Sequence, residues 1–169
     1  MPDDTLSPLR STLLDALDRA LAGDPWHGTA LDRLLRDVPA DAARATPVAG
    51  AHSIWAITLH CAAWTDEVAQ RLAGEPPSEP RWGDWPAVPP DGGDAEWHEA
   101  RARLADAHAR ARAALLARDE AHLRDEVGDG RDPALGTGLT HAAMVAGLVQ
   151  HHAYHGGQVA LLRRALGLG

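Results

Sequence analysis

The sequence predicts an all-α protein, a four-helix bundle with a long crossover between the second and third helices. Apolar residues recur every three or four positions in four long segments, as on a helix face that packs against a core. No segment shows the alternation of apolar and polar residues that is typical of a β-strand. Because 169 residues is the size of one domain, we expect residues 1–169 to form a single domain.

Each expected helix has its own apolar stripe and stop signals. The first carries Leu6, Leu9, Leu13, Leu17 and Leu21 and ends at Gly23 and Pro25. A shorter amphipathic piece follows over 31–38. The second helix is expected over 54–73, between Ser53 as N-cap and Gly74. The third is expected near 95–117 and the fourth near 139–165, after the Gly-rich break at 128–138.

The segment "EPPSEPRWGDWPAVPPDGGD" over 75–94 cannot be helical, because it contains six prolines and three glycines. Its length suits a crossover that passes over an end of the bundle. Its Trp82 and Trp85 suggest a lid or an apolar pocket wall, to which Trp64 would contribute; the alternative is that they plug the bundle's end.

The charge of the chain disfavours two classes of partner. Its 24 acidic residues exceed its 16 basic ones, all of them arginine, which gives a net charge of −8. Such a surface repels nucleic-acid phosphates and anionic lipid, so we expect neither nucleic acid nor membrane as a partner. No secretory signal is visible, and Cys61 is the only cysteine. A cytoplasmic location is therefore expected.

The most unusual stretch is "LVQHHAYHGGQVALLRR" (148–164), which places three histidines in an otherwise apolar helix. His151 and His155 are four positions apart, a spacing from which two imidazoles can bind one metal ion. His152 and His155 lie three apart and also share a face, so periodicity does not choose between the two pairs. His60 adds a third imidazole from the apolar middle of the second helix.

Three histidines from two helices would leave coordination positions free for water or substrate, as catalytic metal sites do. The simpler interpretation of a histidine on an apolar face is a core residue satisfied by a hydrogen bond, and we assign His108 to that class. Zinc is the first expectation for an imidazole-rich site, with nickel, iron, manganese and copper as alternatives that also accept histidine.

These motifs resemble those of the DinB/YfiT-like superfamily. "QHHAYHGGQVALLRR" is similar to the signature of its last helix, and "HSIWAITLHCAAWTDEVAQRLAGE" to the pattern of its second helix. "PWHGTALDRLL" after the first helix also looks like members of this group. The resemblance implies a four-helix bundle, commonly dimeric, that holds one divalent metal through His60, His151 and His155. His152 and Gln158 would then support the ligands, and Tyr154 also matches the motif.

We consider three functional hypotheses, of which the first follows from the resemblance. In the first, the chain is a metal-dependent transferase or hydrolase: the metal activates a low-molecular-weight thiol, such as bacillithiol or mycothiol, or water for attack on a small electrophile, in stress or detoxification. Candidates for further catalytic residues are Glu67, Asp66 and Tyr154. The second is a non-catalytic, metal-stabilised dimer of a stress response. In the third, a coiled-coil-like adaptor, the histidines are incidental.

Overall fold

The computed structural model describes residues 7–169, which leaves Leu6 of the first apolar stripe outside the described residues. Within that range the chain is all-helical and contains no strand, as the sequence predicts. The helices are α1 (Pro8–Leu21), α2 (Leu31–Leu35), α3 (Ala40–Arg44), α4 (Ile54–Ala73), α5 (Asp94–Leu116), α6 (Glu120–Arg124) and α7 (His141–Ala165).

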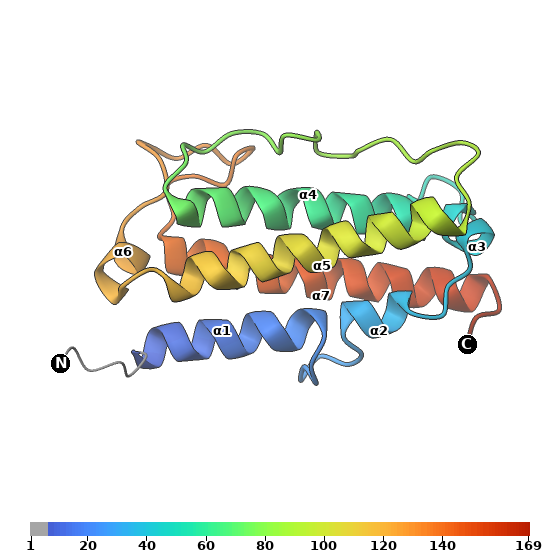
Figure 1. The fold of residues 1–169 in the computed structure, drawn as a ribbon, viewed down its shortest axis with the longest axis horizontal. Coiled ribbons are helices and arrows are strands. Elements are labelled where there is room, and N and C mark those ends of the chain that lie inside the picture. Colours follow the sequence, from blue (N-terminus) through green and yellow to red (C-terminus); the bar gives the residue numbers. More distant parts are fainter. Residues whose placement is uncertain (1–6) are drawn as a thin grey trace.

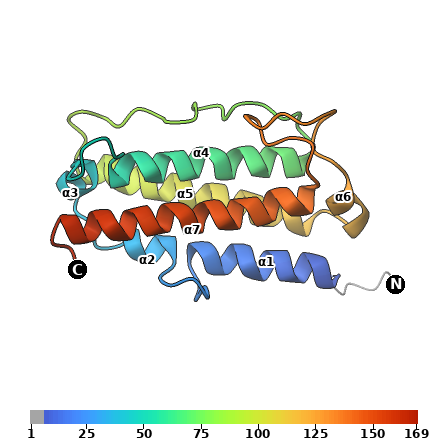
Figure 2. The ribbon, with the colours of Figure 1, turned by 180° about the vertical axis from the view of Figure 1, so that it is seen from behind.

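The long helices α1, α4, α5 and α7 lie side by side, and the short α2 extends the line of α1 (Figure 1, Figure 2). The helix α4 packs along α5, and α7 contacts both α1 and α4. Figure 1 shows that α1 and α7 run in one direction while α4 and α5 run in the other. Because α4 and α5 are parallel, the chain between them must return along the whole length of the bundle.

The crossover between α4 and α5 makes this return beside α4, in the opposite direction (Figure 1). The backbone N–H of Ser78 donates to Glu67, in the second half of α4. Further along the crossover, the carbonyl of Asp84 accepts from His60, which lies in the first half of α4. The expectation that this segment passes over an end of the bundle is therefore wrong. The structure confirms that this segment connects α4 to α5 and that it is not helical.

Local capping explains where α4 and α7 begin. The hydroxyl of Ser53 accepts a hydrogen bond from the N–H of Ala56, which confirms this residue as the N-cap of α4. Gly74 ends α4 with φ of 103°, a conformation that favours glycine. The last helix begins at His141 rather than near 139, because the Thr140 hydroxyl caps it.

Two apolar clusters fill the core, one toward each end of the bundle. Leu17, Val68, Leu115 and Val145 belong to the first. Trp55, Trp97, Leu104 and Val159 belong to the second. Between them lies a polar layer of buried or half-buried side chains: His60, Thr65, His108, His151, His152 and His155. Polar groups in a core must be hydrogen-bonded or bind a ligand, so this layer is where a functional site is expected.

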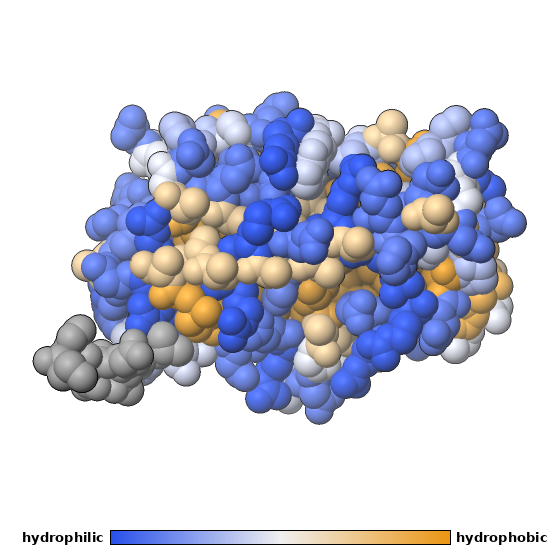
Figure 3. All heavy atoms as spheres, in the orientation of Figure 1, coloured by the Kyte–Doolittle hydropathy of each residue, from blue (hydrophilic) through white to orange (hydrophobic). Residues whose placement is uncertain are grey.

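The outer surface indicates less about a functional site than the polar layer does. On the face shown in Figure 3, hydrophilic residues cover most of the molecule. A paler band lies over α5, whose Ala105, Ala109 and Ala113 are exposed at successive turns. None of the described helices has the length and apolar character that a membrane span requires.

Candidate metal centre

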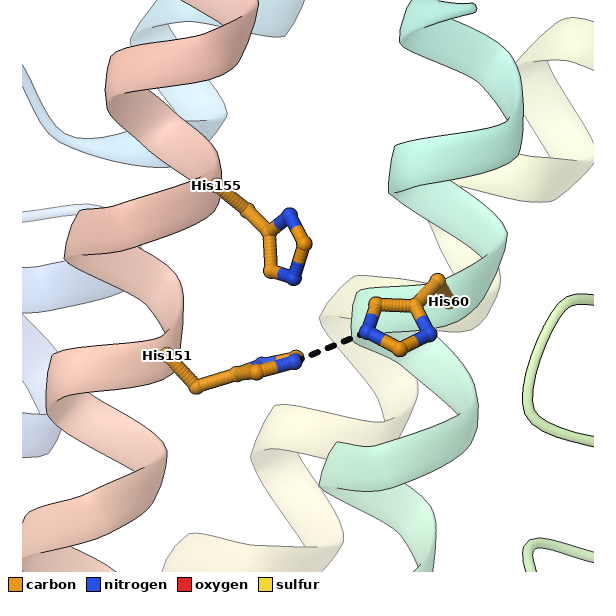
Figure 4. Close-up of side chains that lie close together, drawn as sticks. All are labelled: His60, His151 and His155. Atoms are coloured by element: carbon orange, nitrogen blue, oxygen red, sulfur yellow. Dashed lines mark hydrogen bonds between the residues drawn. The ribbon is translucent and has the colours of Figure 1, made fainter. Parts of the chain in front are cut away.

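The helices α4 and α7 bring His60, His151 and His155 together (Figure 4). One nitrogen atom from each imidazole lies within 4.8 Å of the others, and this is the only such group of three among residues 7–169. The Nε2 atoms of His60 and His151 are 2.9 Å apart. His151 and His155 project from the same face of α7 because they are one helical turn apart.

Hydrogen bonds at the far side of two rings determine which nitrogen atom is free. His60 Nδ1 lies 2.6 Å from the carbonyl oxygen of Asp84, and His155 Nδ1 lies 2.8 Å from Oε1 of Gln158. Since both oxygens accept, each Nδ1 carries the proton and each Nε2 keeps a lone pair. This is how proteins prepare a histidine for a metal. His151 Nδ1 is buried and has no hydrogen-bond partner among the described residues.

Burial keeps these imidazoles neutral. It lowers the pKa of His151 to about 3, helped by the neighbouring imidazoles of His155 and His60. It also lowers the pKa of His60 and that of His155, more than their hydrogen bonds to Asp84 and Gln158 raise them. A neutral imidazole offers a lone pair, so the three rings are in the protonation state that a metal requires.

The neighbouring His152 faces elsewhere. Its side chain is buried, and its Nε2 lies 3.0 Å from the hydroxyl of Thr65 on α4. That hydroxyl donates to the carbonyl of Cys61, so it accepts from His152. His152 is thus a core residue that links α7 to α4, while His151 is the residue that faces His60. Periodicity left open whether His151 or His152 pairs with His155. The rotation of α7 about its axis decides this, because it turns His151 toward His60.

Asp66 and Glu67 are both buried, and arginines surround them. Glu67 Oε1 is 2.8 Å from Nε of Arg71 and accepts from the N–H of Ser78. Asp66 accepts from Arg81 and Arg110. Both carboxylates are therefore engaged in holding the crossover and α5 to α4, and neither bonds to an imidazole of the cluster.

The aromatic candidates lie in different surroundings. Tyr154 is 67% exposed, and its ring and that of His155 are nearly perpendicular, with centroids 5.0 Å apart. The ring of Trp82 lies under the guanidinium of Arg81. Trp85 stacks on His60 with ring centroids 3.9 Å apart and planes 8° from parallel. Trp85 thus covers the face of one imidazole, and neither tryptophan plugs an end of the bundle.

Trp64 lines a cavity of about 180 Å³ that reaches His151. Its other walls are mainly apolar side chains of α4, α7 and the loop before α7, including Val68, Leu139, Met144 and Leu148. A small apolar molecule fits a space of this size and lining.

The donor set fits a divalent metal. It consists of two Nε2 lone pairs fixed by hydrogen bonds, together with a third imidazole whose buried Nδ1 lacks a partner. Three neutral nitrogen donors suit zinc and other first-row divalent ions. Two further residues lie around the three histidines. Asp84 accepts a hydrogen bond from His60, and the imidazole of His52 stacks on the other face of Trp85.

Sequence comparison places the chain in a family. The family model of the DinB superfamily matches residues 26–159, which include all of α4 and most of α7. The chain therefore belongs to the DinB superfamily, as the motifs of α4 and α7 predict. The comparison with curated proteins and that with solved structures gave no match.

Sequence reasoning did not find Asp84 or His52. Asp84 is one of several acidic residues in a segment without periodicity, and His52 precedes the N-cap of α4. The available signal was the pair Trp82 and Trp85 on either side of Asp84, because two tryptophans are unexpected in a simple linker. The path of the crossover brings Asp84 to His60 and places Trp85 against both His60 and His52.

Proposed function

We propose that this protein is a metal-dependent enzyme in which His60, His151 and His155 hold one divalent ion, zinc in the first instance. The observation that carries this proposal is the convergence of three neutral imidazoles from α4 and α7 within 4.8 Å. A divalent ion held by three neutral ligands keeps its full charge and lowers the pKa of a thiol or water bound beside it.

The proposed reaction is the transfer of a group from a small electrophile to a low-molecular-weight thiol, with water as the alternative nucleophile. The sulfur forms a bond to the electrophilic carbon, the leaving group departs with the bonding electron pair, and the thiol proton goes to solvent. We assign no side chain as general base, since Asp66 and Glu67 already bind arginines. The three histidines would hold the ion beside which the nucleophile binds, and the rest of the protein would orient the electrophile.

The cavity beside His151 supports a substrate that is largely apolar. Its lining joins Trp64 and Met144 to a ligand of the proposed metal. An electrophile with a compact apolar body would occupy it, with its reactive carbon toward the imidazoles. The charged residue in its lining, Arg71, already donates to Glu67 and to the carbonyls of Leu135 and Ser78. A charged substrate of the same size would therefore lose its hydration there without gaining a free partner.

A homodimer is part of this proposal, and one face of α7 supports it. Beyond the residues that line the cavity, its exposed residues at successive turns are uncharged and include Tyr154, Gly157 and Leu161. A Cβ added at Gly157 would meet nothing within 4 Å, so nothing described in this chain explains a glycine there. Close approach of a second copy is our explanation for the glycine. A non-catalytic, metal-stabilised dimer is the second candidate function.

A panel of thiols tests the enzymatic proposal. Untagged protein loaded with zinc is mixed with a thiol and a chromogenic electrophile such as an aryl halide, and product formation is compared with that of H155A. Turnover that depends on zinc and is lost in H155A supports an enzyme. A folded zinc-loaded protein that accelerates neither thiol addition nor hydrolysis, and whose dimer dissociates without zinc, would favour the structural alternative.

A further inference from the structure

The crossover residue Asp84 approaches His60 with two different oxygen atoms. Its carbonyl oxygen lies 2.6 Å from Nδ1 of the imidazole, and its carboxylate Oδ1 lies 3.2 Å from the same atom. The indole N–H of Trp64 donates to Oδ1 over 2.6 Å. Trp64 is one helical turn after His60, so α4 itself fixes the carboxylate beside the ring.

The next residue, Trp85, fixes the same imidazole by its face. Its indole is sandwiched between His60 and His52, at centroid separations of 3.9 and 3.5 Å and within 8° of parallel to both. Asp84 therefore holds the edge of the His60 ring that is opposite its free Nε2, while Trp85 prevents the ring from tilting. Two adjacent residues of a non-helical segment define the orientation of one imidazole.

The charge of Asp84 lies beside the three imidazoles. Its carboxylate Oδ1 is 3.2 Å from Nδ1 of His60, on the side of that ring away from the nitrogen that would bind the metal. A negative group in this place favours a divalent ion among the rings. Asp84 is half exposed, so solvent weakens this effect without removing it.

We propose that Asp84 and Trp85 are positioning residues for His60, and that the crossover thereby sets how tightly the three-histidine site binds a divalent metal. The arrangement is a carboxylate–histidine pair behind a metal ligand, whose loss usually lowers metal affinity 10- to 100-fold. This inference rests on the proposed metal site. It adds that a segment remote from α7 in sequence controls the affinity of that site.

The test measures metal binding rather than activity, with Zn²⁺ and Co²⁺ as probes. D84N keeps the backbone carbonyl and the size of the side chain but removes the charge. Its matched control is D91N, since Asp91 is an exposed acidic residue of the same segment. We expect the Kd for Zn²⁺ to rise about 10- to 100-fold in D84N and to stay unchanged in D91N.

Two further readouts separate positioning from simple stabilisation. The visible absorption of bound Co²⁺ reports ligand orientation, so its bands should shift in D84N while the Tm of the metal-free variant stays close to that of wild type. W85A should also raise the Kd, whereas W82A should not, because Trp82 contacts Arg81 rather than a histidine.

The outcomes distinguish this inference from the proposed function. If wild-type protein binds neither ion, the proposed function itself fails. If wild type binds both ions and D84N does so with the same Kd and the same Co²⁺ spectrum, only the positioning role is overturned. A D84N variant that loses metal-free Tm and affinity together, with an unshifted spectrum, would also overturn it, because Asp84 would then act on the fold alone.

Discussion

The Nε2 atoms of His60 and His151 lie 2.9 Å apart, although 91 positions separate the two residues in the sequence. The Nδ1 proton of His60 is held by the Asp84 carbonyl, so only His151 can supply a proton between the two rings. A divalent metal would take the place of that proton, and both nitrogens would then present lone pairs. A proton and a divalent metal would therefore compete for the Nε2 atoms of His60 and His151.

Adjacent histidines should respond differently to substitution. We expect H151A to lose the bound metal with little change in the stability of the metal-free protein, because His151 is only half-buried. H152A should keep one metal per chain but lose about 2–4 kcal/mol of stability, because it leaves a cavity and removes the bond to Thr65. Metal analysis and thermal melts in a chelator measure both effects. Loss of metal in H152A alone would reverse the assignment.

The metal-free protein should lose stability as the pH falls below neutrality. Burial lowers the pKa of His152 from 6.5 to about 3, so between these values the unfolded chain takes up a proton that the folded chain refuses. Stability is therefore full above pH 6.5 and declines on acidification, by at most about 1.4 kcal/mol per pH unit for this group. Denaturant titrations from about pH 7.5 to about pH 4.5 should show a shallower decline in H152Q than in wild type. Equal slopes would show that His152 is not the residue responsible.

The buried pair of Glu67 and Arg71 predicts a stability effect rather than a catalytic one. E67Q leaves the guanidinium of Arg71 buried without its counter-charge, which should cost about 3 kcal/mol or more. Metal content should not change. E79Q is the control, since Glu79 is exposed on the crossover. If E67Q melts like wild type but abolishes turnover, Glu67 is a general base after all.

Filling the cavity beside His151 should weaken substrate binding without affecting the metal. Gly147 lines this cavity, and a Cβ added there would meet nothing within 4 Å, so G147L is compatible with α7. We expect KM for an apolar electrophile to rise at least several-fold, with unchanged zinc affinity and an equal or higher Tm. Unchanged kinetics with a substrate that wild type turns over would place the binding site elsewhere.

The helices could be predicted well because their signals are local. The bounds of α4 follow from the Ser53 cap and the Gly74 terminator, both readable within one turn of the helix ends. The path of the crossover could not be predicted. It depends on whether α5 runs parallel or antiparallel to α4, and no residue of the segment encodes that direction by itself.

The candidate site was predictable to the extent that helix periodicity determines it. Spacing identified His155 with either His151 or His152, and the family resemblance selected His151, which is the residue that faces His60. The physical reason is a rotation of about 100° per residue about the axis of α7, which tertiary packing alone fixes. Asp84 remained hidden because its role arises from a long-range contact with no periodic signal.

The decisive measurement is the metal content of protein purified without a histidine tag, for wild type and for H60A, H151A and H155A. We predict close to one divalent ion per wild-type chain after equilibration with zinc and dialysis, and a loss of most of that ion in each variant, all of which keep their helical circular dichroism. Wild-type protein that retains no ion and whose Tm does not rise with added zinc would contradict the metal site on which the proposed function depends.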